Sequence, residues 1–306
     1  MYYRALNEYL RDRFGCKVYK LSLCSGCTCP NRDGALGRDG CSFCSGSGEF
    51  SPSAALPIPE QLAQARRLVS GKVRDARYIA YFQSYTNTYA PAGVLRPLFE
   101  AAIAPEDVAV LSIATRPDCL PPDILALLRE LAQRKPLWVE LGLQTMHEET
   151  ARRIRRGYPL SCFEDAVGAL RALGAEVIVH QILGLPGETP EQMVQTSAYI
   201  GRCGAAGVKL HLLHVLRGTQ LALDYEAGRL RTLGLEEYIT LLERCLRVLP
   251  PELVVHRLTG DGAKRALLAP LWSADKKRVL NEIHRRFLQD DLIQGSAISA
   301  RGVYAP

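Results

Sequence analysis

Hydrophobic and polar positions divide the chain into two alternating kinds of segment. Short runs rich in β-branched and aromatic residues predict strands at residues 77–82, 108–113, 137–143, 176–183, 207–213 and 253–256. Apolar residues near helical spacing predict helices at residues 59–68, 92–103, 122–133, 148–154, 162–173, 190–203 and 235–248. Strand and helix alternating in this way predict an α/β protein whose parallel sheet curls into a full or partial barrel.

Polar loops follow four of the predicted strands. Their sequences are QSYTNTYAP after residue 82, ATRPDC after residue 113, QTMHEET after residue 143 and GLPGETPEQM after residue 183. A single loop of this kind is commonly polar. Because the carboxyl ends of parallel strands meet at one rim, the four loops together predict a ligand site at that rim.

A cysteine-rich loop precedes these elements. The stretch CTCPNRDGALGRDGCSFC begins at Cys27, and the polar residues between its cysteines cannot form a core. Cys41 and Cys44 form a CxxC pair, which lets two thiolates reach one metal centre from a tight turn, and Cys29 lies upstream of them. Two kinds of centre fit this spacing. A structural zinc ion would take a fourth thiolate from Cys24 or Cys27, whereas a [4Fe-4S] cluster held by three cysteines leaves one iron open to a substrate.

Composition limits the remaining possibilities. The chain has 306 residues, of which 47% are hydrophobic and 23% charged, so it can bury one large core. Half of its ten cysteines lie between Cys24 and Cys44, which favours a metal site in a reducing compartment over a disulfide framework. The charged N-terminus is unlike a signal peptide and no apolar run could span a membrane, so we expect a cytoplasmic protein without a membrane partner. The net charge of +6 permits an anionic partner such as RNA without requiring one.

Short motifs along nearly the whole chain resemble the radical S-adenosylmethionine (SAM) superfamily. They are TCPNRDG followed by GCSFC, then YFQSYTNTYAP, SIATRPDCL, ELGLQT, IRRGY, HQILGLPGET, KLHLLHVLRGT, HRLTGD and PLWSADKK. The Cx11CxxC spacing of the first two is similar to that of the subgroup related to the Elongator catalytic subunit. The resemblance implies a partial (β/α)6 TIM-type barrel in a single domain. Its parts would be an N-terminal cluster loop at residues 24–50, a barrel core at about 75–260 and a C-terminal helical extension at 261–306.

The resemblance also implies a radical SAM enzyme with two cofactors. Cys29, Cys41 and Cys44 would ligate three irons of a [4Fe-4S] cluster, and SAM would chelate the fourth iron through its amino and carboxylate groups. An electron donor such as flavodoxin or ferredoxin would reduce the cluster, which then cleaves SAM to methionine and a 5′-deoxyadenosyl radical. In this interpretation Cys24 and Cys27 are loop residues rather than ligands.

Individual roles follow from matching positions in these motifs. The predicted SAM contacts are Phe43 and Gly184 at the adenine, Gln144 and His180 at the ribose, Gln83 and Ser84 at the methionine amino group, Arg156 at the carboxylate, and Thr115 at the end of its strand. An arginine fork suits a carboxylate physically. The candidate catalytic residues are Tyr85, His211 and His214, of which the two histidines would line a substrate cavity at the barrel mouth.

Charge and the nearest relatives suggest the substrate. The resemblance, together with a basic cluster near the rim, predicts an enzyme that modifies tRNA at a C5 substituent of a wobble uridine. The cluster consists of Arg152, Arg153, Arg155 and Arg156. A second basic cluster, at residues 276–286, is either another phosphate contact or a solvated helix face. Two alternatives remain: a radical SAM enzyme acting on a protein or small metabolite, and a zinc- or cluster-stabilised binding module without turnover.

Overall fold

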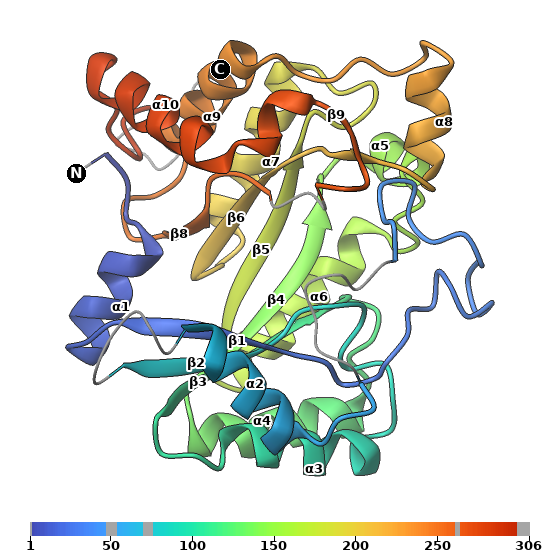
Figure 1. The fold of residues 1–306 in the computed structure, drawn as a ribbon, viewed down its shortest axis with the longest axis vertical. Helices are drawn as coiled ribbons and strands as arrows, with labels where there is room; N and C mark the ends of the chain where they lie inside the picture. The colour runs from blue at the N-terminus through green and yellow to red at the C-terminus, as the bar shows by residue number, and fades with distance from the viewer. Residues whose placement is uncertain (1, 47–53, 70–75, 261–263, 299–306) are drawn as a thin grey trace.

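One parallel sheet forms the centre of the fold, in a computed structural model that describes residues 2–46, 54–69, 76–260 and 264–298 (Figure 1). Its strands are β1 (Val18–Leu23), β2 (Arg77–Phe82), β3 (Val108–Thr115), β4 (Leu137–Gln144), β5 (Glu176–Leu183), β6 (Gly207–Leu212) and β8 (Val254–Arg257). They lie in the order β1-β2-β3-β4-β5-β6-β8, and all neighbouring pairs are parallel. In the described part of the chain the two edge strands do not pair with each other. The sheet is therefore a curled half-barrel, which confirms the predicted partial barrel.

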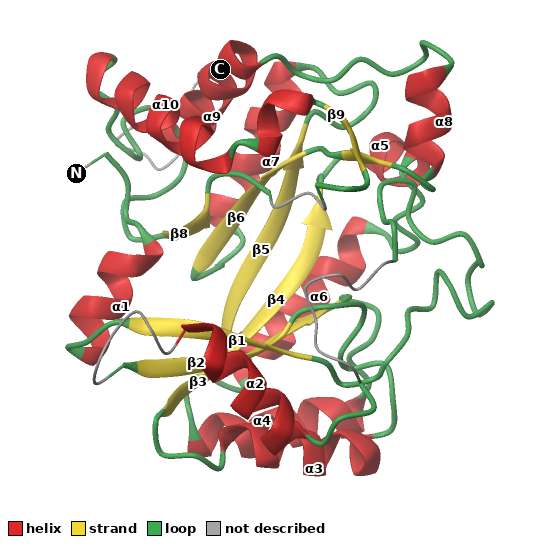
Figure 2. Cartoon of the chain, viewed as in Figure 1, coloured by secondary structure: helices red, strands yellow, loops and turns green. Residues whose placement is uncertain are grey.

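Helices lie around the outside of the curved sheet (Figure 2). Those predicted from the sequence are α2 (Ile58–Val69), α3 (Ala92–Ile103), α4 (Pro122–Arg134), α5 (Glu148–Arg153), α6 (Leu160–Ala172), α7 (Pro190–Arg202) and α9 (Leu235–Arg247). Local chemistry fixes where α7 begins, because Thr189 and Gln192 form a capping box there and Pro190 occupies the first turn. Within the described residues, no helix combines the length and the apolar character that crossing a membrane requires.

The C-terminal part adds a smaller layer to one end of the sheet. It contains the antiparallel pair β7 (Val215–Leu216) and β9 (Leu267–Ala269), the short helices α8 (Gln220–Glu226) and η1 (Leu271–Ala274), and α10 (Lys276–Gln289). Val279, Ile283 and Phe287 bury one face of α10 in the main core. The predicted C-terminal helical extension is confirmed in this described portion.

β4 shows how the sheet separates its two faces. Leu141 and Leu143 are buried in the main core between the sheet and the helices, where a fully buried side chain of this size contributes about 1.5–3 kcal/mol. Glu140, Gly142 and Gln144 alternate with them along the strand and line a cavity on the opposite face. The outer face of the strand thus stabilises the fold, and the inner face supplies polar groups to a site.

The sequence analysis missed several elements of the structure. These are α1 (Leu6–Phe14), β1, β7, α8 and β9, and with β1 the main sheet has one strand more than the sequence predicted. In β1 only Leu21 and Leu23 are fully buried, and Lys20 interrupts the apolar pattern because its side chain reaches a buried carboxylate. Residues 47–50 of the predicted cluster loop lie outside the described residues. The predicted single-domain division of the chain stays a prediction.

Candidate active site

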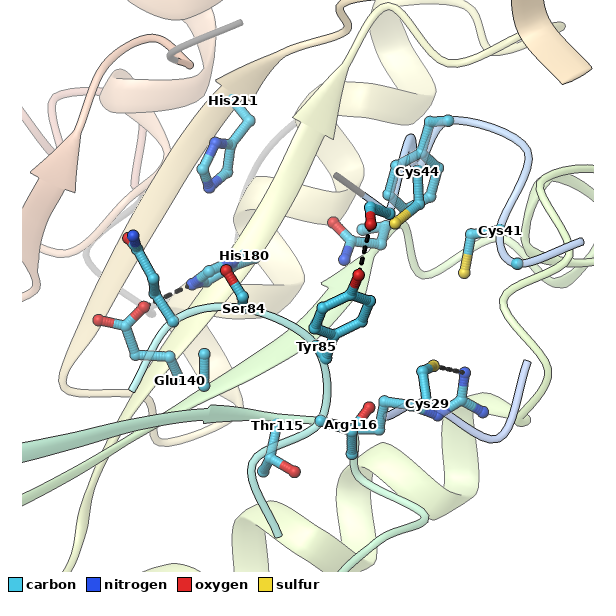
Figure 3. A pocket seen from close by; sticks show the side chains of 18 of the residues that line it. Cys29, Cys41, Cys44, Ser84, Tyr85, Thr115, Arg116, Glu140, His180 and His211 are labelled. Atoms are coloured by element: carbon cyan, nitrogen blue, oxygen red, sulfur yellow. Dashed lines mark hydrogen bonds and ion pairs between the residues drawn. The ribbon is translucent and has the colours of Figure 1, made fainter. Parts of the chain in front are cut away.

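A cavity of about 430 Å³ opens between the cysteine loop and the carboxyl ends of β2 to β6 (Figure 3). The predicted site residues that line it are Cys29, Cys41, Phe43, Cys44, Gln83, Ser84, Tyr85, Thr115, Gln144, Arg156, His180 and His211. The volume falls in the range of about 300–1,000 Å³ that is usual for small-molecule sites. Three of the four polar loops that the sequence placed at one rim contribute residues to this cavity, and the loop after β5 does not.

All three predicted ligand thiols line this cavity, and two of them have a hydrogen-bond donor beside the sulfur. Asn31 donates from Nδ2 to Cys41 Sγ at 3.2 Å, and Arg116 Nη1 lies 3.9 Å from Cys29 Sγ. None of the three forms a disulfide. Burial raises the pKa of Cys41 to about 11, and Asn31 opposes that shift because an N–H donor stabilises the thiolate. Such donors suit sulfurs that act as anionic metal ligands.

The two upstream cysteines are placed differently. Neither Cys24 nor Cys27 is among the residues that line the cavity. The backbone of Cys24 is tied to α2, because its N–H donates to Gln61 Oε1 at 2.8 Å and its carbonyl accepts from Gln61 Nε2 at 3.1 Å. Across the described residues, no group of three His, Cys, Asp or Glu side chains lies close enough to hold a single metal ion.

Asn87, which the sequence analysis did not select, holds the loop after β2 in place. This fully buried residue donates from Nδ2 to the carbonyls of Phe82, Ser84 and Ala114 at 2.9–3.2 Å. Within this loop, Tyr85 follows Ser84 and adopts a left-handed backbone with φ of 62°, which is strained for a residue with a side chain. The amide of Asn87 compensates for this strain and fixes Gln83 and Ser84 at the cavity wall.

A second left-handed residue, Gln144 with φ of 66°, ends β4. Nearby, Arg156 is 1% exposed and donates to the carbonyls of Leu143, Thr145 and Tyr158 at 2.7–3.2 Å. Its remaining contact is an ion pair with Glu148 at 3.1 Å. Four of its five guanidinium N–H groups are thus used inside the protein. The predicted contact of Arg156 with the SAM carboxylate stays a prediction, with one donor left to make it.

Charged side chains that the sequence analysis did not select meet on the inner face of the sheet. Glu140 of β4 is 1% exposed, and its carboxylate accepts from Tyr81 Oη at 2.8 Å and from Ser112 Oγ at 3.1 Å. Lys209 of β6, 2% exposed, pairs with the same carboxylate, and Lys20 of β1 lies 3.5 Å from it. Although burial opposes ionisation, Lys209 and Lys20 hold the pKa of Glu140 well below its usual range.

His180 belongs to the same network. Its Nε2 lies 2.9 Å from Glu140 Oε2, and its ring lies 5.0 Å from that of His211 (Figure 3). Burial lowers the pKa of His180 to about 4, and Lys209 adds to that effect. Burial likewise lowers the pKa of His211 well below its usual range. Both imidazoles are therefore neutral at physiological pH.

The structure does not bring two predicted residues into this cavity. His214 lies beyond the end of β6 with its ring against Gly260, so it does not line the cavity as expected. The reason is strand geometry, because residues three apart on an extended chain point to opposite sides. Gly184 has φ of 93° and lines a different cavity beside Leu233, so the predicted adenine contact of Gly184 has no support in this geometry.

Comparison with known families agrees with this arrangement. Residues 27–200 match the radical SAM superfamily, and residues 205–289 match the Radical_SAM C-terminal domain. The chain belongs to the radical SAM superfamily.

Two relatives match nearly the full length of the chain. Protein YtqA of Bacillus subtilis (strain 168) is 44% identical over 96% of this chain and 92% of its own length. Protein YhcC of Escherichia coli (strain K12) is 41% identical over 94% of this chain and 93% of its own length. The fold is similar to that of the archaeal Methanocaldococcus infernus Elp3 with an N-terminal deletion, with a TM-score of 0.70 at 15% identity over 94% of this chain and 68% of that one.

Enzymes of this superfamily use a [4Fe-4S] cluster and SAM, and the chain is accordingly a radical SAM enzyme with these cofactors. This excludes the alternative of a binding module without turnover. The residues present fit both groups. Three unbonded thiols line the cavity, two of them with N–H donors beside the sulfur, and the cavity also has room and polar groups for a nucleoside.

Proposed function

We propose that Cys29, Cys41 and Cys44 hold the [4Fe-4S] cluster and that SAM binds between them and the inner faces of β2 to β5. The observation that carries this proposal is the meeting of the three thiols and the polar strand ends in one cavity. When bound, the reduced cluster would supply the electron that splits SAM into methionine and a 5′-deoxyadenosyl radical. A small redox protein such as flavodoxin or ferredoxin would deliver that electron.

The side chains around the thiols would bind and orient SAM. Gln83 and Ser84, whose loop is held by Asn87, line the cavity and suit the methionine amino group. Phe43 packs against a small apolar cluster and lines the cavity, where its ring suits an adenine face. Gln144 is proposed for the ribose, and the predicted ribose contact of His180, whose Nε2 lies 2.9 Å from Glu140 Oε2, stays a prediction. Closing these groups around SAM would keep water from the radical.

The substrate we propose is tRNA, modified at a C5 substituent of a wobble uridine. The support is the relation to Elp3 and the exposed arginines Arg152, Arg153 and Arg155, which flank in sequence the buried Arg156 of the cavity lining. Arg153 and Arg155 each pair with one acidic side chain, Glu149 and Asp39 respectively, at the surface. Such exposed pairs are weak, so phosphates can replace their carboxylates. A protein or small-metabolite substrate is the alternative.

The cluster assignment is tested by removing single cysteines. Anaerobic reconstitution of Cys29→Ala, Cys41→Ala and Cys44→Ala should give proteins without the iron-sulfur absorption band and with little bound iron and sulfide. Cys24→Ala and Cys27→Ala are matched controls, because they come from the same loop but do not line the cavity. A cluster retained in Cys41→Ala would refute the assignment, and a cluster lost in Cys24→Ala would assign that residue a metal role.

The tRNA proposal is tested by comparing modified nucleosides in total tRNA from cells with and without the protein. We expect one nucleoside to change. In filter binding, affinity for native tRNA should fall steeply with salt, and Arg152→Glu/Arg153→Glu should weaken it. Lys276→Glu/Lys277→Glu is the charge-matched control, because α10 and α5 lie on opposite sides of the molecule (Figure 1). Binding that ignores both salt and charge reversal would move the substrate to a protein or metabolite.

A further inference from the structure

The part of the cavity furthest from the thiols is built from polar side chains of the sheet itself. We name this part the barrel floor, and it consists of Tyr81, Glu140, His180, Lys209, His211 and Arg257. In Figure 3 Glu140, His180 and His211 lie on one side of the cavity, and Cys41 and Cys44 lie on the other. The barrel floor therefore adjoins the proposed SAM site without sharing its thiol ligands.

Among the described residues, positive charge exceeds negative charge at the barrel floor. Lys209 and Arg257 line it, Lys20 reaches it from β1, and Glu140 is the carboxylate that pairs with Lys209 and Lys20. The ammonium groups of Lys20 and Lys209 lie 4.8 and 4.7 Å from the ring centre of Tyr81, one more sign of how closely the cations are gathered. Burial lowers the pKa of Lys209. The Lys209–Glu140 pair has no net charge whether the shared proton lies on the amine or on the carboxylate. Lys20 and Arg257 therefore give the barrel floor a positive net charge.

The barrel floor also offers an unused hydrogen-bonding group. The Nε2 atom of His211 is buried and has no hydrogen-bond partner among the described residues. A buried polar atom without a partner costs about 1–3 kcal/mol. An apolar substrate group would leave that cost in place, and a cationic group would be repelled. An anionic group that accepts hydrogen bonds would satisfy the charge and, with the proton of the neutral imidazole on Nε2, would also accept from His211.

We propose that the barrel floor binds a carboxylate of the substrate, and so holds the substrate's neighbouring carbon within reach of SAM. The proposal rests on the proposed function in that SAM must occupy the thiol side of the cavity. A guanidinium fork and an ammonium recognise the two in-plane oxygens of a carboxylate. Phosphate groups are typically held by backbone N–H groups at loops and helix N-termini, and the barrel floor is made of strand side chains.

The test is calorimetric titration of the cluster-loaded protein, saturated with SAM, with malonate, acetate and inorganic phosphate. We expect saturable malonate binding in the wild type and a dissociation constant raised at least tenfold in Arg257→Gln and in Lys209→Met. Arg257→Gln carries the test if loss of Lys209 prevents folding. Arg231→Gln is the matched control, because Arg231 is an exposed arginine with its own carboxylate partner, Glu237. Its malonate affinity should equal that of the wild type.

The outcomes separate this inference from the proposed function. A wild-type protein that takes up cluster and SAM, binds no free carboxylate and binds native tRNA independently of Arg257 would overturn the inference alone, whereas failure to bind cluster or SAM would overturn the proposed function. Phosphate bound more tightly than malonate, or equal losses in Arg257→Gln and Arg231→Gln, would also overturn the inference.

A second arm identifies the source of the carboxylate. If a free acid carries it, malonate binds without tRNA. If a tRNA substituent carries it, Arg257→Gln lowers the affinity for native tRNA at least tenfold and leaves the affinity for an unmodified transcript unchanged. Either result supports a carboxylate site, and the absence of both overturns it.

Discussion

Arg156 can be assigned either to the fold or to SAM, and truncating it separates the two roles. Its guanidinium donates to three backbone carbonyls and pairs with Glu148, and the side chain is almost fully buried. Removing it leaves those carbonyls without donors, at about 1 kcal/mol each, and breaks an ion-pair contact worth about 1.5–3 kcal/mol. Because such terms are not additive, we expect Arg156→Ala to lower the free energy of unfolding by roughly 3–5 kcal/mol.

A direct contact with the SAM carboxylate would give a different result. Loss of that contact should lower the affinity for SAM about ten- to a hundredfold, because a charge-assisted hydrogen bond contributes about 1.5–3 kcal/mol. Urea unfolding of the cluster-free protein measures the first effect, and calorimetry with SAM on the reconstituted protein measures the second. Arg153→Ala is the control, since that neighbouring arginine is half-exposed and its ion pair contributes at most about 1 kcal/mol.

We expect a large loss of stability in Arg156→Ala and a small one in Arg153→Ala. An Arg156→Ala protein that is as stable as the wild type but binds SAM at least tenfold more weakly would refute the structural role of Arg156. That result would mean that the guanidinium leaves its carbonyl partners when SAM is present and turns to the SAM carboxylate.

Two further predictions concern buried carboxylates. Glu140→Leu should destabilise the protein by roughly 3–5 kcal/mol in denaturant unfolding, because Lys209 loses its buried counter-charge, and Glu140→Leu/Lys209→Met should restore part of the loss; a double variant no more stable than the single one would contradict this. Burial and the nearby Asp290 raise the pKa of Glu243 to about 7. The folded state therefore binds a proton that the unfolded state releases, and stability should fall as pH rises from about 4.5 to 7. Glu243→Gln should accordingly stabilise the protein by roughly 1–2 kcal/mol at pH 8 and by little at pH 4.5, and equal effects at both pH values would argue against the shift.

The sequence predicted the elements whose apolar pattern is continuous. β5 and α3 begin and end as expected, because long apolar runs and regular helical spacing are local signals. β1 escaped notice because its stability comes from pairing with β2 and from a lysine that reaches across the sheet to Glu140. Such partners are distant in sequence, so no local pattern reports them.

The same distinction holds for the site. Cys29, Cys41 and Cys44 were predicted from spacing, and the structure brings them to one cavity. Glu140 and Lys209 did leave a signal, since each is a single charge inside an apolar strand. A charge at such a position needs a buried partner of opposite charge. Comparing the two predicted strands would therefore have suggested that Glu140 and Lys209 form an ion pair. The structural role of Arg156 depends on carbonyls whose directions no sequence motif shows.

The alternation along β4 makes chemistry and folding separable in this protein. Exchanging Gly142 or Gln144 alters groups that face the cavity and leaves the contacts of Leu141 and Leu143 untouched. A lineage can therefore change what the cavity accepts while keeping the same scaffold, and a directed-evolution library confined to inward positions should retain a high proportion of folded variants. Glu140 is the exception, since its carboxylate both lines the cavity and neutralises a buried lysine. New specificities at that position should arise by paired changes with Lys209.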